Sequence, residues 1–415
     1  MTPQPPAAAK TSMRNWLLPA HIEDILPPEA QRVESLRARL LELFRTHGFQ
    51  MVMPPLLEYV DSLRVGTGVD LDLRTFKLVD QLSGRLMGLR ADITPQVARI
   101  DAYLAQRPGI ARYAYCGSVL HARPATAAGR RELLQLGAEL FGHGAVESDI
   151  EVQQLLLEAL AVAGVRDVHL DFGHVGVFRA LAARAGIDAA GEASLFAALQ
   201  AKDEPLVHAL TAELAPDWRD ALRRLPRLYG DRQVLAAARS ELPALPEIAR
   251  ALNELDAMAD ATAASMASLH FDLAELRGYG YHSGAVFAAY TAGHATAIAA
   301  GGRYDAVGRA FGRGRAATGF SLDLLELAAL VGPPSAPGAI LAPAGDAHGL
   351  AQAVAALRAR GEVVVSDLPG DERPVEELCC DRVLVLHAGQ WQVEPRRPLQ
   401  DAAPSSSGKE SWAET

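Results

Sequence analysis

Cysteine is scarce in this 415-residue chain, and so are long apolar runs. The three cysteines, Cys116, Cys379 and Cys380, are too few and wrongly spaced for a disulfide framework or a zinc site. No run of about 18 uncharged apolar residues occurs, so the sequence predicts no transmembrane helix and no membrane partner. The N-terminal segment lacks the basic-then-apolar order of a signal peptide. We therefore expect a cytoplasmic protein without a metal site.

Positive charge is also in deficit, since the formal net charge is −10. Dedicated nucleic-acid binders normally present a basic face, so this balance argues against nucleic acid as a partner. Five arginines do lie between positions 219 and 232, where a solvated helix face explains them. Glycines and arginines alternate from 308 to 315, but no G-K-[ST] follows them, so they favour a phosphate cradle only weakly.

Apolar residues, by contrast, are plentiful. A hydrophobic content of 49% with 22% charged residues is typical of a globular protein, and 415 residues suffice for two or three domains. Residues 1–12 and 398–415 are predicted to be disordered tails. Residues 13–332 are expected to form the main domain, with an alanine-rich helical insertion at about 175–268. The linker P-P-S-A-P-G precedes a small β-α-β-β domain, and together they occupy 333–397.

Local patterns predict several helices in the main domain. An apolar stripe predicts the first, from Pro28 to Gly48. A second is predicted to begin with Thr94 as its cap and Pro95 at its first helical position. A third is expected to begin at a capping box formed by Ser148 and Glu151.

One strand pattern bears on function. Over Glu132–Phe141 apolar side chains alternate with Gln135, Gly137 and Glu139, which therefore share the opposite face. Two polar side chains on either side of a glycine form a floor on which a small polar ligand can lie. A strand with one face in water gives the same pattern, so both interpretations stay open.

Two glycine-rich stretches follow near the end of the main domain. They are Leu276–Phe287 (L-R-G-Y-G-Y-H-S-G-A-V-F) and Ala299–Asp305 (A-A-G-G-R-Y-D). Glycines beside aromatic and charged residues indicate backbone that comes close to a ligand. An ordinary glycine-broken hairpin is the alternative.

In this order, the stretches resemble histidyl-tRNA synthetase, a class II aminoacyl-tRNA synthetase. E-D-I-L-P at 23–27, with the segment up to Glu58, is similar to the first class II motif, which builds the dimer interface. Tyr115–Glu139 is similar to the second motif, Arg277–His282 to the histidine signature R-G-L-D-Y-Y, and Gly301–Asp305 to G-G-R-Y-D. The resemblance implies an α+β fold: a class II synthetase-like antiparallel sheet flanked by helices, with a helical insertion and a small C-terminal α/β appendage.

Departures from the synthetase pattern fall where ATP is held. His121, in L-H-A-R, replaces the arginine of F-R-x-E, and Glu326 replaces the arginine of the third motif, G-x-G-x-E-R. An arginine–phosphate contact contributes roughly 1.5–3 kcal/mol, whereas a carboxylate repels phosphate. Gly280 and His282 also replace an aspartate and a tyrosine of the histidine signature. The resemblance therefore implies that adenylate chemistry is lost.

The amino-acid pocket of the family is better preserved. Asp92, within Arg90–Thr94, stands where the family's R-P-E-G-T segment holds the substrate amine. We expect Asp92 to bind the amine of histidine, Arg277 its carboxylate and Glu139 a ring N–H. The candidate histidine-binding residues are Asp92, Thr94, Gln135, Glu139, Arg277, Tyr281, His282 and Tyr304. The alternative is a relict pocket whose residues now only bond one another.

A synthetase-like chain with these departures, and with a C-terminal region too short for an anticodon-binding domain, is identified as a member of the regulatory-subunit family of ATP phosphoribosyltransferase. The resemblance implies a chain without catalytic residues or cofactors that activates a short-form catalytic subunit in the first step of histidine biosynthesis. It implies a dimer within a hetero-oligomer, with histidine as the feedback effector, bound either in this pocket or at the interface with the catalytic chain. An active histidyl-tRNA synthetase and a free-standing paralogue that senses histidine or tRNA stay open as alternatives.

Overall fold

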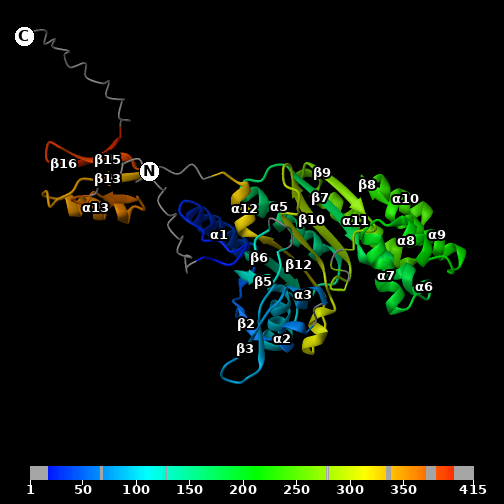
Figure 1. Cartoon of the computed structure of the whole chain (residues 1–415). Coiled ribbons are helices and arrows are strands. Elements are labelled where there is room, and N and C mark those ends of the chain that lie inside the picture. Colours follow the sequence, from blue (N-terminus) through cyan, green and yellow to red (C-terminus); the bar gives the residue numbers. More distant parts are fainter. Residues whose placement is uncertain are drawn as a thin grey trace, which may run out of the picture. The chain divides into compact units, whose positions relative to one another are not determined.

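The computed structural model describes residues 17–65, 69–124, 126, 129–276, 278, 280–332, 338–370 and 380–396. The chain divides into two compact units, Met1–Gly332 and Pro333–Thr415 (Figure 1). The expected tails, 1–12 and 398–415, and linker residues 333–337 lie outside the described residues.

A nine-stranded sheet forms the centre of the large unit, in the order β1-β5-β6-β12-β11-β10-β7-β9-β8. The run of strands from β5 to β7 is antiparallel, whereas β1 pairs with β5 and β9 with β7 in parallel. The strands are β1 (Gln50–Met51), β5 (Ala111–Leu120), β6 (Glu132–Phe141), β7 (Val168–His174), β8 (Tyr229–Gly230), β9 (Ser268–Asp272), β10 (Ala285–Thr291), β11 (Ala299–Arg303) and β12 (Ala317–Asp323). The predicted α+β architecture is confirmed.

The helices α1 (Glu29–Thr46), α5 (Val146–Ala163), α11 (Pro246–Thr262) and α12 (Leu324–Leu330) pack together along the sheet (Figure 1). The apolar stripe predicted for α1 is buried, because residues spaced three and four apart share one helix face. The apolar face of β6 packs into the same core as these helices, with Leu136 and Leu140 almost fully buried. The polar face of β6 is therefore free to form a site on the other side of the sheet.

Between β7 and α11 the chain forms a group of helices, drawn in green in Figure 1: α6 (Val175–Arg184), α7 (Ala189–Gln200), α8 (Glu204–Leu210), α9 (Pro216–Arg224) and α10 (Gln233–Glu241). The segment contains one short strand, β8, where the sequence predicted none. A two-residue strand is too short to produce a period-two pattern, and β8 exists through its pairing with β9.

Two arginines that follow α9 form ion pairs with carboxylates of other helices. Arg227 pairs with Glu204 at 2.6 Å, and Arg232 pairs with Asp256 at 2.9 Å. These arginines therefore lie among carboxylates of the same helical group.

A second, three-stranded sheet lies in the N-terminal part, in the order β2-β4-β3. It is formed by β2 (Leu57–Tyr59), β3 (Phe76–Val79) and β4 (Leu86–Leu89), with α2 (Val60–Arg64) and α3 (Val69–Arg74) between its strands in the chain. The chain then enters α4 (Thr94–Arg99), which continues as a π-helical turn, Ile100–Ala105.

The start of α4 differs from the prediction. Ile93, rather than Thr94, is the cap residue, and Thr94 and Pro95 are the first two residues of the helix. The Thr94 hydroxyl is bonded instead to the hydroxyl of Tyr115, 3.0 Å away on β5. The Thr94 backbone N–H is bonded to the Asp92 carboxylate. The Thr94 side chain, which the local sequence predicted to cap the helix, therefore bonds a residue on β5 instead.

The capping box predicted for α5 is also wrong. The helix begins at Val146, so Ser148 lies inside its first turn and donates to the carbonyl of Ala145. Glu151 pairs with Arg112 of β5 at 2.5 Å instead of closing the box. Again a cross-element ion pair outcompetes the local bond.

The small unit has a four-stranded sheet in the order β14-β13-β15-β16 and one described helix. Its elements are β13 (Ala339–Ala342), α13 (Leu350–Ala359), β14 (Val364–Ser366), β15 (Cys380–His387) and β16 (Gln390–Pro395). A core of its own, including Ile340, Val354 and Leu384, holds it together.

Candidate functional site

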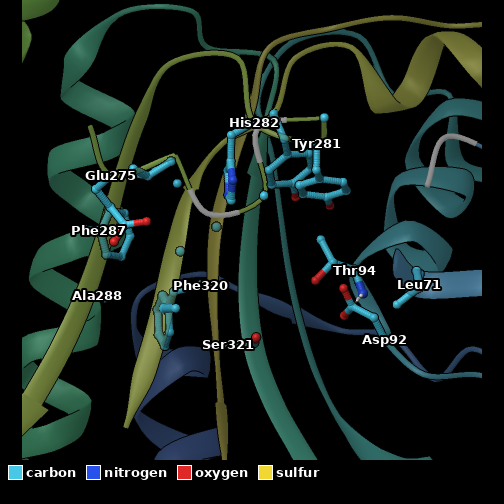
Figure 2. Close-up of a pocket in the computed structure, with 18 of the residues that line it drawn as sticks. Leu71, Asp92, Thr94, Glu275, Tyr281, His282, Phe287, Ala288, Phe320 and Ser321 are labelled. Atoms are coloured by element: carbon cyan, nitrogen blue, oxygen red, sulfur yellow. Dashed lines mark hydrogen bonds between the residues drawn. The ribbon is translucent and has the colours of Figure 1, made fainter. Parts of the chain in front are cut away.

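The polar face of the large sheet carries a cavity of about 1020 Å³. Figure 2 shows Tyr281 and His282 along one rim, and Asp92 and Thr94 together on the side nearer Leu71. The predicted site residues Asp92, Thr94, Glu139, Tyr281, His282 and Tyr304 all line it, although they come from distant parts of the chain. Arg277, the residue predicted to bind a carboxylate, lies outside the described residues.

Small residues make the cavity floor. Glu139 faces Gly319 on β12, which faces Gly302 on β11. In the neighbouring row, Gly137 faces Ser321. A Cβ atom on Gly319 would overlap the Glu139 carboxylate, and one on Gly137 would overlap the Tyr115 hydroxyl. The glycines are therefore needed for the side chains of Glu139 and Tyr115 to cross the sheet surface.

Glu139 is the polar centre of the cavity and is only 1% exposed. The Tyr115 hydroxyl donates to its Oε1 at 3.0 Å, and the Tyr304 hydroxyl donates to its Oε2. Burial raises the pKa of the Glu139 carboxyl to about 8, although both tyrosine hydroxyls favour the charged form. A buried acid of this kind is suited to accept a donor that a ligand brings with it.

Asp92 and its neighbours form a second polar group at the N-terminus of α4. Gln135 Nε2 donates to Asp92 Oδ1 at 2.8 Å, and the Thr94 backbone N–H donates to the same oxygen at 3.1 Å. Gln135 Oε1 in turn accepts from the Ile93 N–H at 2.8 Å. Gln135 therefore holds Asp92 in place, and the carboxylate is the group best placed to meet a cationic amine.

Aromatic rings close the cavity between these two polar groups. Tyr281 stacks on Tyr304 with ring centroids 5.0 Å apart and meets the His282 ring edge-on at 5.4 Å. The Tyr281 hydroxyl is buried and has no hydrogen-bond partner among the described residues. An apolar wall with one unused hydroxyl fits a planar ring that carries a polar atom.

Two arginines in the segments similar to the synthetase motifs, Arg303 and Arg90, hold parts of the fold together. Arg303 is 5% exposed and pairs with the buried Asp149 at 2.7 Å, which ties β11 to the first turn of α5. Arg90 is 6% exposed and donates to the backbone carbonyls of Ser118 and Pro54. Neither guanidinium is among the residues that line the cavity.

The described cavity lining is rich in negative charge. Its carboxylates outnumber its two cationic or titratable basic residues, Arg74 and His282. The acidic residues are Asp92, Asp171, Glu192 and Glu275, together with Glu139, whose raised pKa of about 8 favours its neutral form at pH 7. Such a lining attracts an ammonium or a ring N–H and repels phosphate groups.

The positions where the sequence departs from the synthetase motifs are occupied by other contacts. His121 Nε2 lies 3.0 Å from the carbonyl of Ala91, and burial lowers the pKa of its ring. Glu326 Oε1 lies 2.5 Å from His294 Nε2 and accepts from the Thr296 hydroxyl. Both side chains are therefore engaged in contacts within the chain, and neither presents a cation to the cavity.

Sequence reasoning missed Tyr115 as a site residue. It is fully buried and bonds both Thr94 and Glu139. Strand pairing contained the signal, because Tyr115 is directly opposite Gly137 and a glycine opposite a tyrosine leaves room for its ring. Asp171 and Glu275, at the far end of the cavity, were also missed and carry no motif of their own.

Metal-binding clusters and membrane-spanning helices are both absent from the described part of the chain. It contains no group of three or more His, Cys, Asp or Glu side chains placed to hold a metal ion. None of its helices is long and apolar enough to span a membrane.

Two family models match the chain, one for each unit. The model described as histidyl-tRNA synthetase matches residues 21–327. The model described as ATP phosphoribosyltransferase subunit HisZ C-terminal domain matches residues 337–394. The combination joins a synthetase-like unit to a C-terminal domain described for a different enzyme.

Several curated relatives match nearly the whole chain, and they share one name. The ATP phosphoribosyltransferase regulatory subunit of Ralstonia pickettii (strain 12J) is 56% identical over 92% of this chain and 98% of its own. That of Burkholderia cenocepacia (strain HI2424) is also 56% identical, over 92% and 100%.

Solved structures agree on the fold. An ATP phosphoribosyltransferase regulatory subunit/histidyl-tRNA synthetase from Bacillus halodurans has a TM-score of 0.77 at 27% identity, covering 89% of this chain and 97% of that one. Histidyl-tRNA synthetase from Nostoc has a TM-score of 0.72 at 16% identity, covering 92% and 97%, which shows the fold alone. The class II synthetase-like fold is confirmed, and the chain belongs to the family of ATP phosphoribosyltransferase regulatory subunits.

Proposed function

We propose that this chain is a non-catalytic regulatory subunit that activates a short-form catalytic subunit of ATP phosphoribosyltransferase and binds histidine as a feedback effector in the cavity described above. The observation that carries the proposal is the contrast within one site. The groups suited to histidine converge on the cavity, whereas His121 and Glu326 stand where the resembling enzymes grip ATP.

Histidine fits the chemistry of the cavity at two of its three polar groups. Its ammonium matches Asp92 and Thr94, and its ring N–H matches Glu139. The ring itself would lie against Tyr281 and Tyr304, whose stacked pair supplies an apolar wall. Its carboxylate needs a cation, and Arg277 remains the residue proposed for that role on the basis of the family motif.

A synthetase activity is not supported by this site. Glu326 is engaged with His294, so the third-motif position offers a carboxylate where an ATP phosphate needs a cation. The arginines near α9 are paired with carboxylates, which gives no support to tRNA binding there. We therefore propose that the site binds an amino acid and does not activate it.

Feedback through such a subunit requires linkage. Histidine inhibits only if it binds one quaternary state of the complex more tightly than another, and a coupling of 1–3 kcal/mol is typical. The cavity is lined by strands, α4 and α7 of one unit, so a ligand there would contact several elements at once.

Self-association of this chain is part of the proposal. Six apolar side chains share one face of the β2-β4-β3 sheet, and each is exposed or half-buried. They are Leu57, Tyr59, Phe76, Leu78, Met87 and Leu89. On the other face, Leu63 of α2 packs against Gly88. A second copy of this chain would cover the apolar face, which is too continuous to be ordinary solvent-exposed surface.

The test is the initial rate of condensation of ATP with phosphoribosyl pyrophosphate by the cognate short-form catalytic subunit. We expect the rate to rise on addition of this chain and to fall again when histidine is added. Glu139→Ala should keep the activation but lose the histidine response, because it removes the ring acceptor. The matched control is Glu213→Ala, a carboxylate exposed on the helical insertion, which should respond to histidine as the wild type does.

Each alternative predicts a different result. No rise with the cognate subunit refutes the regulatory role and favours the free-standing sensor. A histidine response that survives Glu139→Ala places the effector at the interface with the catalytic chain. Histidine-dependent exchange between ATP and pyrophosphate by this chain alone would establish a synthetase.

A further inference from the structure

Tyr115 connects two polar groups of the cavity, Thr94 and Glu139. Its hydroxyl oxygen is 3.0 Å from Thr94 Oγ1 and 3.0 Å from Glu139 Oε1, and its side chain is fully buried. The room for it is provided by Gly137 on the paired strand, where any Cβ atom would overlap the phenol. Thr94 and Glu139 both line the cavity, so Tyr115 bridges two groups that can each contact a ligand.

A phenol hydroxyl has a single proton, so Tyr115 can donate to only one of its two partners at a time, and two arrangements of the bridge follow. When the Glu139 carboxylate accepts, Tyr115 donates to it and its own oxygen accepts from the Thr94 hydroxyl. The lone pairs of Thr94 then remain available to accept from a ligand. When Glu139 carries its own proton and donates to Tyr115, Tyr115 donates to Thr94, and the Thr94 proton points away from Tyr115.

The second arrangement is accessible in the empty cavity, because burial raises the pKa of the Glu139 carboxyl to about 8. A ring N–H donated to Glu139 makes its oxygens acceptors and selects the first arrangement. Thr94 then meets an ammonium as an acceptor, which is favourable. In the second arrangement Tyr115 already uses one of the two Thr94 lone pairs, so Thr94 is a weaker acceptor for the same ammonium.

We propose that Tyr115 is a positioning residue that couples recognition of the ligand ring at Glu139 to recognition of its α-ammonium group at Thr94. This inference rests on the proposed histidine pocket and adds a specificity rule to it. The site prefers a ligand that carries both an imidazole N–H and a free amine over one that carries the ring alone, by more than the separate contacts provide.

The test compares two ligands by isothermal titration calorimetry on the full chain. One is L-histidine, and the other is 3-(imidazol-4-yl)propionate, which is the same molecule without its amine. In the wild type the dissociation constant of the propionate divided by that of L-histidine measures the contribution of the amine. In Tyr115→Phe we expect this ratio to fall roughly ten-fold, the size of one hydrogen bond that involves a charged group.

The control is Tyr304→Phe, which also removes a hydroxyl donor from Glu139 but has no described bond to Thr94. It should weaken both ligands by a similar factor and leave the ratio unchanged. A ratio that stays at the wild-type value in Tyr115→Phe, with both affinities lowered together, overturns the coupling and leaves Tyr115 as a structural residue only.

Glu139→Gln provides a second variant if Tyr115→Phe does not fold. Its amide N–H₂ can donate to Tyr115, which favours the arrangement in which Thr94 accepts from Tyr115 and is the weaker acceptor for the ammonium. The ratio should therefore fall in Glu139→Gln as well, and an unchanged ratio there also overturns the coupling. Failure of the wild-type chain to bind L-histidine at all would overturn the proposed pocket and the coupling together, which distinguishes the two failures.

Discussion

Replacement of Glu139 by glutamine should change how the stability of the protein depends on pH. The carboxyl is 1% exposed, and burial raises its pKa from 4.5 to about 8. The native state therefore holds a proton that the unfolded state has lost between these two pH values. The contribution is fully present below pH 4.5 and is lost as the pH rises to about 8. The pKa difference of about 3.5 units corresponds to a decrease in the free energy of unfolding on the order of 5 kcal/mol over this pH range.

The assay is urea unfolding of the wild type and Glu139→Gln at several pH values between 5 and 8.5, at one protein concentration. Glutamine keeps the shape of the side chain but does not titrate, so the variant should gain stability relative to the wild type as the pH rises. Asp323, whose pKa burial raises to about 6, contributes equally to both proteins and cancels in the difference. Two profiles that run parallel across this range would refute a buried, proton-holding Glu139.

Two further predictions concern the cavity floor and the apolar sheet face. Gly137→Ala should lower histidine affinity and destabilise the fold by about 1–3 kcal/mol, because its Cβ would overlap Tyr115 and lie 2.6 Å from the carbonyl of Phe320. Calorimetry and thermal unfolding check this, with Gly332→Ala as the control, since Gly332 has open space around it and is not among the residues that line the cavity. Leu78→Asp should weaken self-association in analytical ultracentrifugation, whereas Leu206→Asp, at a similarly exposed leucine on α8, should not; equal sedimentation of Leu78→Asp and wild type would contradict the proposed interface.

Two residues of the candidate site followed from strand parity, and the others came from the resemblance to the synthetase motifs. The alternation over Glu132–Phe141 placed Gln135 and Glu139 on the face opposite the leucines, and the structure has them there. Period two needs no tertiary information, because successive side chains in a strand always point to opposite faces. The fold class followed from the order of the motifs, and the structural and family comparisons confirm it.

Helix starts were less accessible to sequence reasoning. Thr94 and Ser148 have the chemistry of cap residues, but the Thr94 hydroxyl bonds Tyr115, and the Ser148 hydroxyl accepts from Arg303. A local cap contributes about 1 kcal/mol, and a buried tertiary partner of similar strength can displace it. Residues close in sequence can reveal only the local option.

The sequence by itself determined the alternation of polar and apolar positions, the glycines that open the sheet surface, and the replacement of two phosphate-binding arginines by His121 and Glu326. Only the tertiary structure decided that Asp92, Glu139 and Tyr304 share one cavity, and that Tyr115 lies beneath it to bond Thr94 and Glu139 at once. The physical reason is that hydrogen bonds and burial act over a few ångströms in space, whereas these residues are up to 212 positions apart, from 92 to 304, and only the pairing of β5, β6, β12 and β11 brings them together.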